Sequence, residues 1–357
     1  MEKEQAIAER ETANFEFHGT ASEYFRIWVV NTLLSILTLG VYSAWAKVRT
    51  NKYFYGNTRL SGASFDYHAS PIQILKGRLI LVAGLAVYYT VGQYAPGYDA
   101  LILIVMMLFV PYLVVRSLTF QLRNTSYRNI RFGFEGKVKD AYIVYIKAFF
   151  VTILTLGIAT FWADWVRSRY SINNMRFGQS RFETSCTSGE FFGIYIRLFG
   201  LTVLLSIALA LIGAFIAGYS EASAEATGDI SALGVMSFVE AVLIILYLPM
   251  ALFFVAYMQA RKFNLLANTT LIADKHQLAS RLKVGKLFWI YLSNIIVVIF
   301  SVGLMIPWAK IRVAKYRITQ TQIQVKGSLD NVLASETQYI SAMGEEVGDY
   351  MDVDLGF

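Results

Sequence analysis

The chain has 357 residues, of which 56% are hydrophobic and 16% are charged, whereas soluble domains usually carry about 25% charged residues. This composition excludes an ordinary soluble domain and indicates a multi-pass membrane protein. The single cysteine, Cys186, excludes an internal disulfide, and with only three scattered histidines it excludes a zinc-type cluster. The formal net charge is +7, and the distribution of this charge predicts the topology.

A segment near the N-terminus is repeated later in the chain. The residues from Phe15 to Asp66 align without a gap with those from Phe132 to Glu183, at a separation of 117 positions. A third, weaker copy runs through Gly303. This pattern predicts internal parallel repeats, two full and one partial. The expected division is an N-terminal tail at 1–13, repeat 1 at 14–128, repeat 2 at 129–265, partial repeat 3 at 266–329, and an acidic flexible tail at 330–357.

Long apolar stretches within the two full repeats predict transmembrane helices, because an open sheet edge cannot satisfy its backbone in lipid. They lie at 79–94, 100–116, 198–217 and 233–257. The connections 93–99 and 217–236 contain no Lys or Arg, whereas five basic blocks lie between the other segments. By the positive-inside rule, the four stretches form two transmembrane hairpins, and the bulk of the loops and the C-terminus are cytoplasmic.

Three shorter apolar segments are each followed by basic residues and interrupted by glycine. They are Tyr24–Ala44 with Gly40, Tyr142–Phe161 with Gly157, and Leu287–Ile306 with Gly303. We interpret each as a helix, a turn and a second helix that returns to the cytoplasmic side, since glycine breaks helices at little steric cost. The alternative is that all three are ordinary transmembrane helices, which would give seven spans and violate the charge rule locally.

The second helix of each such hairpin carries tryptophan followed by Lys or Arg, which is typical of a helix in the headgroup layer. The residues predicted to contact anionic lipid headgroups at this interface are Trp45, Lys47, Arg49, Lys52, Trp162, Arg167, Arg169, Trp308, Lys310, Arg312 and Lys315. Ordinary topology anchoring explains the same residues without a further function.

Short aromatic stretches with alternating apolar and polar residues predict half-buried strands in the basic blocks. They lie at 14–17, 58–60, 64–67, 129–134, 175–177, 181–184, 269–272 and 322–325. Because one strand pair alone is only marginally stable, we expect the strands to pool into one sheet. The predicted fold class is an α-helical multi-pass membrane protein with short strands forming a cytoplasmic sheet.

The repeated segments resemble a known family. The residues that carry the resemblance are Phe15, Phe17, Gly19, Thr20, Tyr24-Phe25, the run from Asn31 to Tyr42, Trp45-Ala46, Lys52-Tyr53, and the run from Asn57 to Phe65. They look like the YjgN-like bacterial inner-membrane proteins, a domain of unknown function numbered 898. The resemblance covers roughly residues 14 to 330 and is weaker after Met236. It implies a bacterial inner-membrane location and a multi-pass fold, and it brings no ligand or catalytic residue.

Polar side chains inside the three short apolar segments are the candidate substrate-binding residues, since such groups are costly in lipid. Asn31 and Asn294 occupy equivalent positions, 263 apart, and Lys147 stands one position earlier in its own copy. One interpretation is that the three converge on a shared site near the inner face of the membrane. The other is that each only caps or bridges neighbouring helices.

Two functions from different classes fit these features. The first is transport or permeation of a small solute or lipid, because repeated units with broken helices build such sites. The alternative is a non-catalytic membrane scaffold that recruits cytoplasmic partners through its sheet and acidic tail. We expect no enzyme activity, no cofactor, no bound metal and no nucleic-acid binding. The lipid bilayer is the expected partner, and a homo-oligomer or a cytoplasmic partner is left open.

Overall fold

The computed structural model describes residues 10–95, 97–227, 232–273 and 275–326. The strands are β1 (Arg10–Phe17), β2 (Thr58–Leu60), β3 (Ala63–Tyr67), β4 (Thr125–Tyr127), β5 (Ile130–Phe134), β6 (Met175–Phe177), β7 (Ser180–Thr184), β8 (Thr270–Ile272), β9 (His276–Ser280) and β10 (Thr321–Lys326). The expected acidic tail at 330–357 lies outside the described residues, as does the N-terminal tail up to residue 9.

The helices come in pairs, and the pairs alternate along the chain with the strand hairpins β2–β3, β4–β5, β6–β7 and β8–β9. Three short pairs are α2 (Ala21–Leu37) with α3 (Ser43–Gly56), α6 (Val138–Leu154) with α7 (Thr160–Asn173), and α10 (Val284–Phe300) with α11 (Ile306–Thr319). Two long pairs are α4 (Pro71–Tyr94) with α5 (Asp99–Arg123), and α8 (Ser188–Thr227) with α9 (Ala232–Thr269). Short and long pairs alternate along the chain.

The ten strands close into one antiparallel barrel, in the order β1-β10-β9-β8-β7-β6-β5-β4-β3-β2. Closure is made by β1, which pairs with β10 on one side and with β2 on the other. The predicted fold class was therefore wrong: the strands do not form a cytoplasmic sheet beneath a purely helical multi-pass fold. A closed barrel leaves no exposed sheet edge, which removes the sites at which strands of other chains pair.

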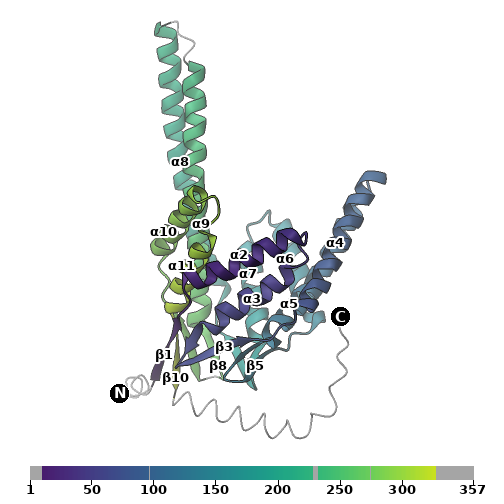
Figure 1. Ribbon diagram of the computed structural model, residues 1–357. Helices are drawn as coiled ribbons and strands as arrows, with labels where there is room; N and C mark the ends of the chain where they lie inside the picture. Colours follow the sequence, from purple (N-terminus) through teal and green to yellow (C-terminus); the bar gives the residue numbers. More distant parts are fainter. Residues whose placement is uncertain (1–9, 96, 228–231, 274, 327–357) are drawn as a thin grey trace, which may run out of the picture.

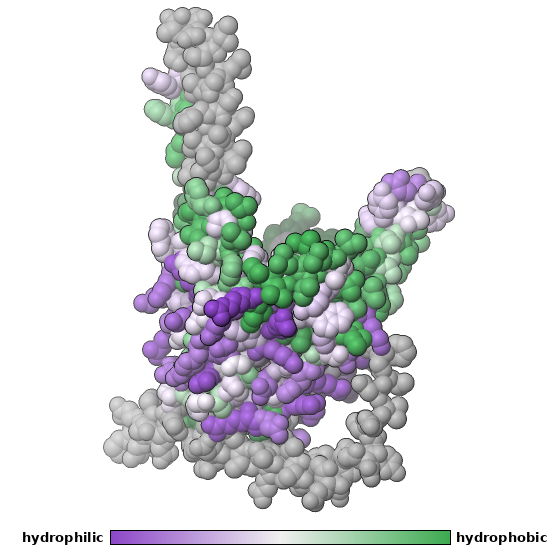
Figure 2. Space-filling view, viewed as in Figure 1, coloured by the Kyte–Doolittle hydropathy of each residue, from purple (hydrophilic) through white to green (hydrophobic). Residues whose placement is uncertain are grey.

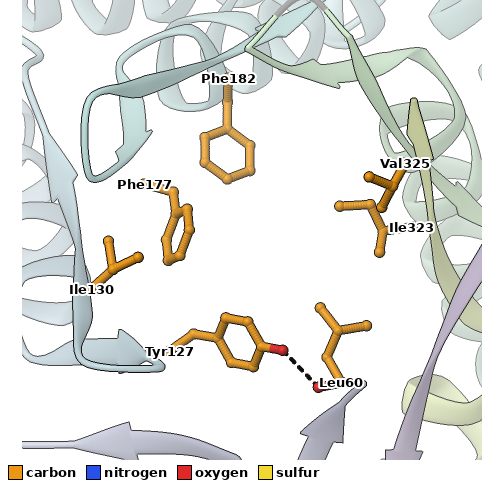
Figure 3. Packing of buried hydrophobic residues seen from close by; sticks show 7 residues of the cluster. All are labelled: Leu60, Tyr127, Ile130, Phe177, Phe182, Ile323 and Val325. Atoms are coloured by element: carbon orange, nitrogen blue, oxygen red, sulfur yellow. Dashed lines mark hydrogen bonds between the residues drawn. The ribbon is translucent and has the colours of Figure 1, made fainter. Parts of the chain in front are cut away.

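The barrel interior is filled by apolar side chains from every part of the sheet (Figure 3). The buried set is Leu60, Tyr127, Ile130, Phe177, Phe182, Ile323 and Val325. Aromatic rings meet across neighbouring strands, with centroids 4.8 Å apart for Phe65 and Tyr127 and 4.9 Å apart for Phe132 and Phe177. The Tyr127 hydroxyl donates a hydrogen bond to the Leu60 carbonyl (2.6 Å), which satisfies its polar group inside an apolar core. This packing gives the barrel a hydrophobic core.

The outer face of the barrel is charged. Side chains that alternate with the interior set point outward, as the period of two in a strand requires. Glu135 accepts ion pairs from Arg176 (3.3 Å) and Arg181 (3.2 Å) of the next two strands. These groups are substantially exposed, so they contribute little stability and mark a face that meets water.

All helical pairs leave the barrel from the same end. Tight turns close the strand pairs at the opposite end, for example at Ser61-Gly62 and Arg128-Asn129, where the backbone has positive φ. In Figure 1 the barrel lies at the bottom, the short pairs lie above it, and the long pair α8–α9 rises highest, with α4 leaning to the other side. The molecule therefore has a strand end and a helix end.

The three short pairs have the same dimensions. Their first helices have 17 residues each and their second helices 14. Each pair turns at a residue of positive φ followed by a glycine of positive φ, as at Leu39-Gly40. The turns are held alike: the hydroxyl oxygens of Thr38, Thr155 and Ser301 accept the backbone N–H four residues on, at 2.9, 3.1 and 3.1 Å. Each segment is thus a helix, a turn and a returning helix.

Three of the described helical stretches are long and apolar enough to cross a membrane. They are Pro71–Tyr94, Leu101–Arg123 and Ser188–Tyr219, with mean hydropathies of 1.5, 2.4 and 2.5. The first helices of the short pairs, at 17 residues, measure about 25 Å, short of the roughly 30 Å hydrocarbon core. Helices of the long pairs are therefore long enough to cross the hydrocarbon core, and the first helices of the short pairs are not.

Barrel stability is expected to depend on pH through His276 in β9. Its buried ring accepts a hydrogen bond at Nδ1 from the backbone N–H of Lys326 (3.2 Å). Burial, with a smaller effect of Lys275, lowers the pKa of His276 below its ordinary 6.5. The unfolded chain therefore binds a proton at this histidine more tightly than the folded chain does. The neutral, buried ring stabilises the folded barrel fully above the ordinary pKa, and this stabilisation is lost as pH falls below it. The apparent melting temperature in detergent should drop between about pH 7.5 and about pH 5.5, and drop less in His276→Gln. An equal drop in both proteins would contradict this assignment.

Candidate functional site

The tips of the three short pairs present apolar side chains to the surroundings. Leu39 is 95% exposed, Leu156 is 93% exposed and Val302 is 91% exposed. Their neighbours are also exposed, namely Ile36, Leu37, Val41, Ile153, Leu154, Ile158, Ile299, Phe300 and Leu304. Figure 2 shows a hydrophobic band at the level of these tips, above the hydrophilic surface of the barrel. Contiguous exposed apolar surface of this kind marks an interaction site, and its position beside the long helices points to lipid.

The residues predicted to contact headgroups lie on the returning helices α3, α7 and α11. Lys47, Arg49, Lys52, Arg169, Lys310 and Lys315 are exposed, and Trp45, Trp162, Arg167, Trp308 and Arg312 are partly buried. Several cations lie over aromatic rings, as Arg312 does over Trp308 (5.1 Å to the ring centroid). Lys47 is six residues beyond Val41, which is about 9 Å along the helix axis. A hairpin with its cations among the headgroups would therefore bury its tip to about the depth of an interfacial helix.

The three candidate substrate-binding residues each lie on the first helix of their own short pair. Asn294 is buried and bridges its pair: its Nδ2 donates to the Ala309 carbonyl (3.2 Å), and its Oδ1 accepts from Arg312 Nη1 (3.3 Å). Lys147 is exposed, with its ammonium 5.6 Å from the Trp162 ring centroid. No interaction among the described residues joins Lys147 to either asparagine. Asn294 thus has the bridging geometry of the second interpretation.

Asn31 is the exception among the three. It is 5% exposed, and within the described part of the chain neither its Nδ2 nor its Oδ1 has a hydrogen-bond partner. Such buried, unsatisfied amides are rare, because each costs the desolvation of a polar group without a compensating bond. Asn31 is one of the residues that line a cavity of about 450 Å³.

This first cavity lies between helices from two short pairs and one long pair. Its walls come from α2, α3, the first turns of α4, and α11. A second cavity, of about 440 Å³, is lined by Asn294 and neighbouring residues of α10 and α11. Lys310 lines both cavities, so the two adjoin. Asn31 and Asn294 therefore line adjoining cavities, although they belong to opposite ends of the chain.

The first cavity is cationic. Lys47 of α3, Arg78 of α4 and Lys310 of α11 all line it, and none of the described residues that line it is acidic. Arg78 is held in place by a hydrogen bond that its Nη1 donates to Ser43 Oγ. The sequence interpretation missed Arg78, because it was one basic residue in a block assigned to topology. Its place directly before the apolar stretch 79–94 was the available signal.

The cavity lies at the point where two short pairs meet directly. Elsewhere around the barrel each short pair is flanked by long helices, but α11 packs on α2 with no long pair between them. Within the described residues, β1 and β10 are the first and last strands and pair directly, and no long pair is described between them.

The second short pair, α6 with α7, has an acidic residue at the position equivalent to two of the cavity lysines. Lys47 and Lys310 correspond to Asp164, at separations of 117 and 146 positions. Asp164 accepts hydrogen bonds from Lys262 Nζ of α9 (2.6 Å) and from the Tyr195 hydroxyl of α8 (3.1 Å). The acidic residue therefore fastens α7 to the adjoining long pair. The two lysines instead face the open cavity.

Within the described residues, no group of three or more His, Cys, Asp or Glu side chains could hold a metal ion. The polar groups of the residues that line the first cavity are cations, an amide and hydroxyl groups beside apolar surface. Such a set suits binding of an anion or of an amphiphile.

Comparison with known proteins identifies the family. The profile of the family described as "Bacterial protein of unknown function (DUF898)" matches residues 12–350. The chain belongs to the DUF898 family. This confirms the resemblance found in the sequence. Among solved structures, none matches this DUF898 chain.

Curated relatives of this DUF898 chain are named inner membrane protein YjgN. Those of Escherichia coli O157:H7 and of Escherichia coli strain K12 are each 32% identical to it over 149 residues, which is 41% of the chain. These matches span 37% of the length of each relative. The relative of Salmonella typhimurium LT2 is 25% identical over 360 residues, covering 88% of this chain and 89% of its own.

Proposed function

We propose that this protein is an integral protein of the bacterial inner membrane that allows a lipid or lipid-like solute to move across or within the bilayer. The observation that carries the proposal is the set of three equal short pairs with fully exposed apolar tips. They are too short to span, so their tips would end inside one leaflet. The names of the relatives support the inner-membrane location.

The orientation follows from the charge pattern. The long pairs cross the membrane, and the barrel, the loops at its strand end and the C-terminus lie in the cytoplasm, since the basic residues are at the barrel side. The short pairs then enter the cytoplasmic leaflet around the barrel. Apolar wedges confined to one leaflet displace acyl chains there and thin the bilayer locally, which lowers the barrier to a polar headgroup. Transport of this kind needs neither a cofactor nor catalysis.

Lipid movement in proteoliposomes tests the proposal. The purified full chain is reconstituted with a trace of lipid carrying a nitrobenzoxadiazole headgroup, and dithionite is added outside. Protein-free vesicles lose about half the signal, whereas we expect near-complete loss with the protein, because lipids of the inner leaflet become accessible. A parallel panel of small solutes reports permeation of other substrates. Bleaching that stays at the protein-free level, together with no solute flux, would sink the proposal.

The second candidate function is a membrane scaffold. The charged outer face of the barrel supports it, since Arg59, Arg131 and Arg181 are exposed there. A scaffold requires that charge reversal on this face, or removal of residues 331–357, abolishes the physiological role while lipid movement stays at the protein-free level. The transport proposal requires the opposite pattern.

A further inference from the structure

We propose that the first cavity is a binding site for a phosphate group, carried by an anionic lipid headgroup or by a soluble phosphate. The lipid form rests on the proposed function and names its substrate class. The site is built from three helix pairs that are far apart in the sequence, with Lys47, Arg78 and Lys310 as its cations. None of these three has an ion-pair partner among the described residues.

Charge is the first argument. Three like charges that line one space create a local positive potential, which attracts an anion and is weakened by salt where the groups meet water. Both lysines are exposed, so they can reach a ligand, and Arg78 is held by Ser43. An arginine fixed in this way presents the planar donors that match phosphate oxygens.

The unsatisfied amide is the second, independent argument. Asn31 is buried, lines the cavity and lacks a partner for both its donor and its acceptor within the described chain. Its counterpart Asn294 has partners for both groups. A bound phosphate would accept a bond from the Asn31 amide nitrogen, and a hydroxyl of the same ligand would donate to its oxygen. Both amide atoms are covered by neighbouring atoms, so these bonds require the Asn31 side chain to turn toward the cavity.

The comparison with the second short pair is the third argument. In the second short pair, Asp164 stands at the position equivalent to Lys47 and Lys310. Asp164 binds Lys262 of α9 and so joins α7 to α9. The repeated position is cationic and open only at the junction of α2 and α11. Topology requires positive charge on the cytoplasmic side in general, and it does not require cations to cluster at this one junction.

The shape of the site favours a lipid as the source of the phosphate. A cavity of about 450 Å³ is within the usual range for small-ligand sites, and it exceeds what a lone phosphate fills. Its lining includes Trp28 and Ile36, and Ile36 continues into the exposed apolar tip at Leu37. A headgroup among the cations would thus leave its acyl chains along an apolar surface.

The test titrates the full chain in detergent with dioctanoyl phosphatidylglycerol, dioctanoyl phosphatidylcholine or inorganic phosphate. Tryptophan fluorescence reports binding, because Trp28 lines the cavity. We expect saturable binding of the anionic lipid, weakened about tenfold or more in the double variant Lys47→Gln with Lys310→Gln. Replacement of the same two residues by arginine should preserve it. The matched control is Lys52→Gln with Lys315→Gln, which removes two exposed charges from the same helices outside the cavity.

Each outcome separates the sources or overturns the site. Preference for phosphatidylglycerol over inorganic phosphate supports a lipid headgroup, and equal affinity for both supports a soluble phosphate. Equal weakening in the cavity and control variants, or no saturable binding of either ligand, would overturn the proposal. Normal binding without lipid movement would sink the proposed function alone, whereas normal lipid movement without binding would sink this site alone.

Discussion

A fluorophore attached at the tip of any short pair is expected to report a shallow position in the bilayer. Leu39→Cys, Leu156→Cys and Val302→Cys, each in a Cys186→Ser background, place a bimane at these exposed tips. Lipids with a spin label near the headgroup or the first acyl carbons should quench it most strongly, because the tip lies only about 9 Å beyond the cations. A bimane at Val87, near the middle of α4, should be quenched best by mid-chain labels.

Charged tips are expected to stop lipid movement while leaving the protein in the membrane. An aspartate costs about 2.5–3.5 kcal/mol at the centre of a bilayer, so three at shallower depth should drive the tips out of the leaflet. We expect the triple variant Leu39→Asp, Leu156→Asp and Val302→Asp to reduce the bleaching rate about tenfold or more. The long pairs keep the variant membrane-bound through their apolar length.

The corresponding alanine variants are the matched control, since they shorten the tips without adding charge. They should retain most of the lipid movement. Quenching at the mid-plane in the bimane experiment would indicate spanning helices, and quenching only by a water-soluble agent would indicate tips outside the bilayer. Either result would remove the basis of the proposed function.

Much of the helical arrangement is predictable from local signals. The glycine near the end of each short apolar segment, at Gly40, Gly157 and Gly303, marks the turn because only such a residue adopts positive φ without strain. The four long apolar stretches are helices in the structure, with longer bounds, because polar residues at their barrel ends continue the helical backbone. Hydropathy detects only the part of a helix that meets lipid.

The closed barrel was not predictable from the same signals. Strands β4 and β9 were missed: β4 joins β3 of repeat 1 to β5 of repeat 2, and β9 joins β8 to β10 within partial repeat 3. The three residues of β4 begin directly after α5, and β9 has the polar sequence His-Gln-Leu-Ala-Ser. Neither shows clear alternation of large apolar residues. Their pairings with β3 and β10 join segments that are distant in the chain, which is tertiary information.

The candidate site was predictable only in part. Asn31 stands out in the sequence because a polar group in an apolar segment is costly. Arg78 reaches the same cavity as Asn31 through the contact of α4 with α3, and Lys310 reaches it through the direct contact of α11 with α2. This contact arises from barrel closure between the first and last strands, which no local pattern encodes.

Loss of one aromatic side chain from the barrel interior is expected to be the most damaging single change in the fold. The Phe177 ring contacts those of Phe132 and Tyr127, with centroids 4.9 and 6.3 Å apart. Figure 3 shows it among the side chains that fill the barrel. Phe177→Ala removes these contacts and leaves a void, which typically costs about 3–5 kcal/mol. For a chain of this size the apparent melting temperature in detergent should fall by roughly 5–10 °C.

The matched control is Arg181→Ala, on the outer face of the neighbouring strand. Its side chain is 70% exposed and pairs with Glu135, and exposed ion pairs contribute about 0–1 kcal/mol. Phe177→Leu should fall between the two, because it keeps most of the apolar volume. If the Phe177→Ala and Arg181→Ala variants had the same melting temperature, the barrel interior would not be the packed core that supports the helical pairs. Because every pair joins two barrel strands, loosening the core should also impair lipid movement at lower temperature than in the wild type.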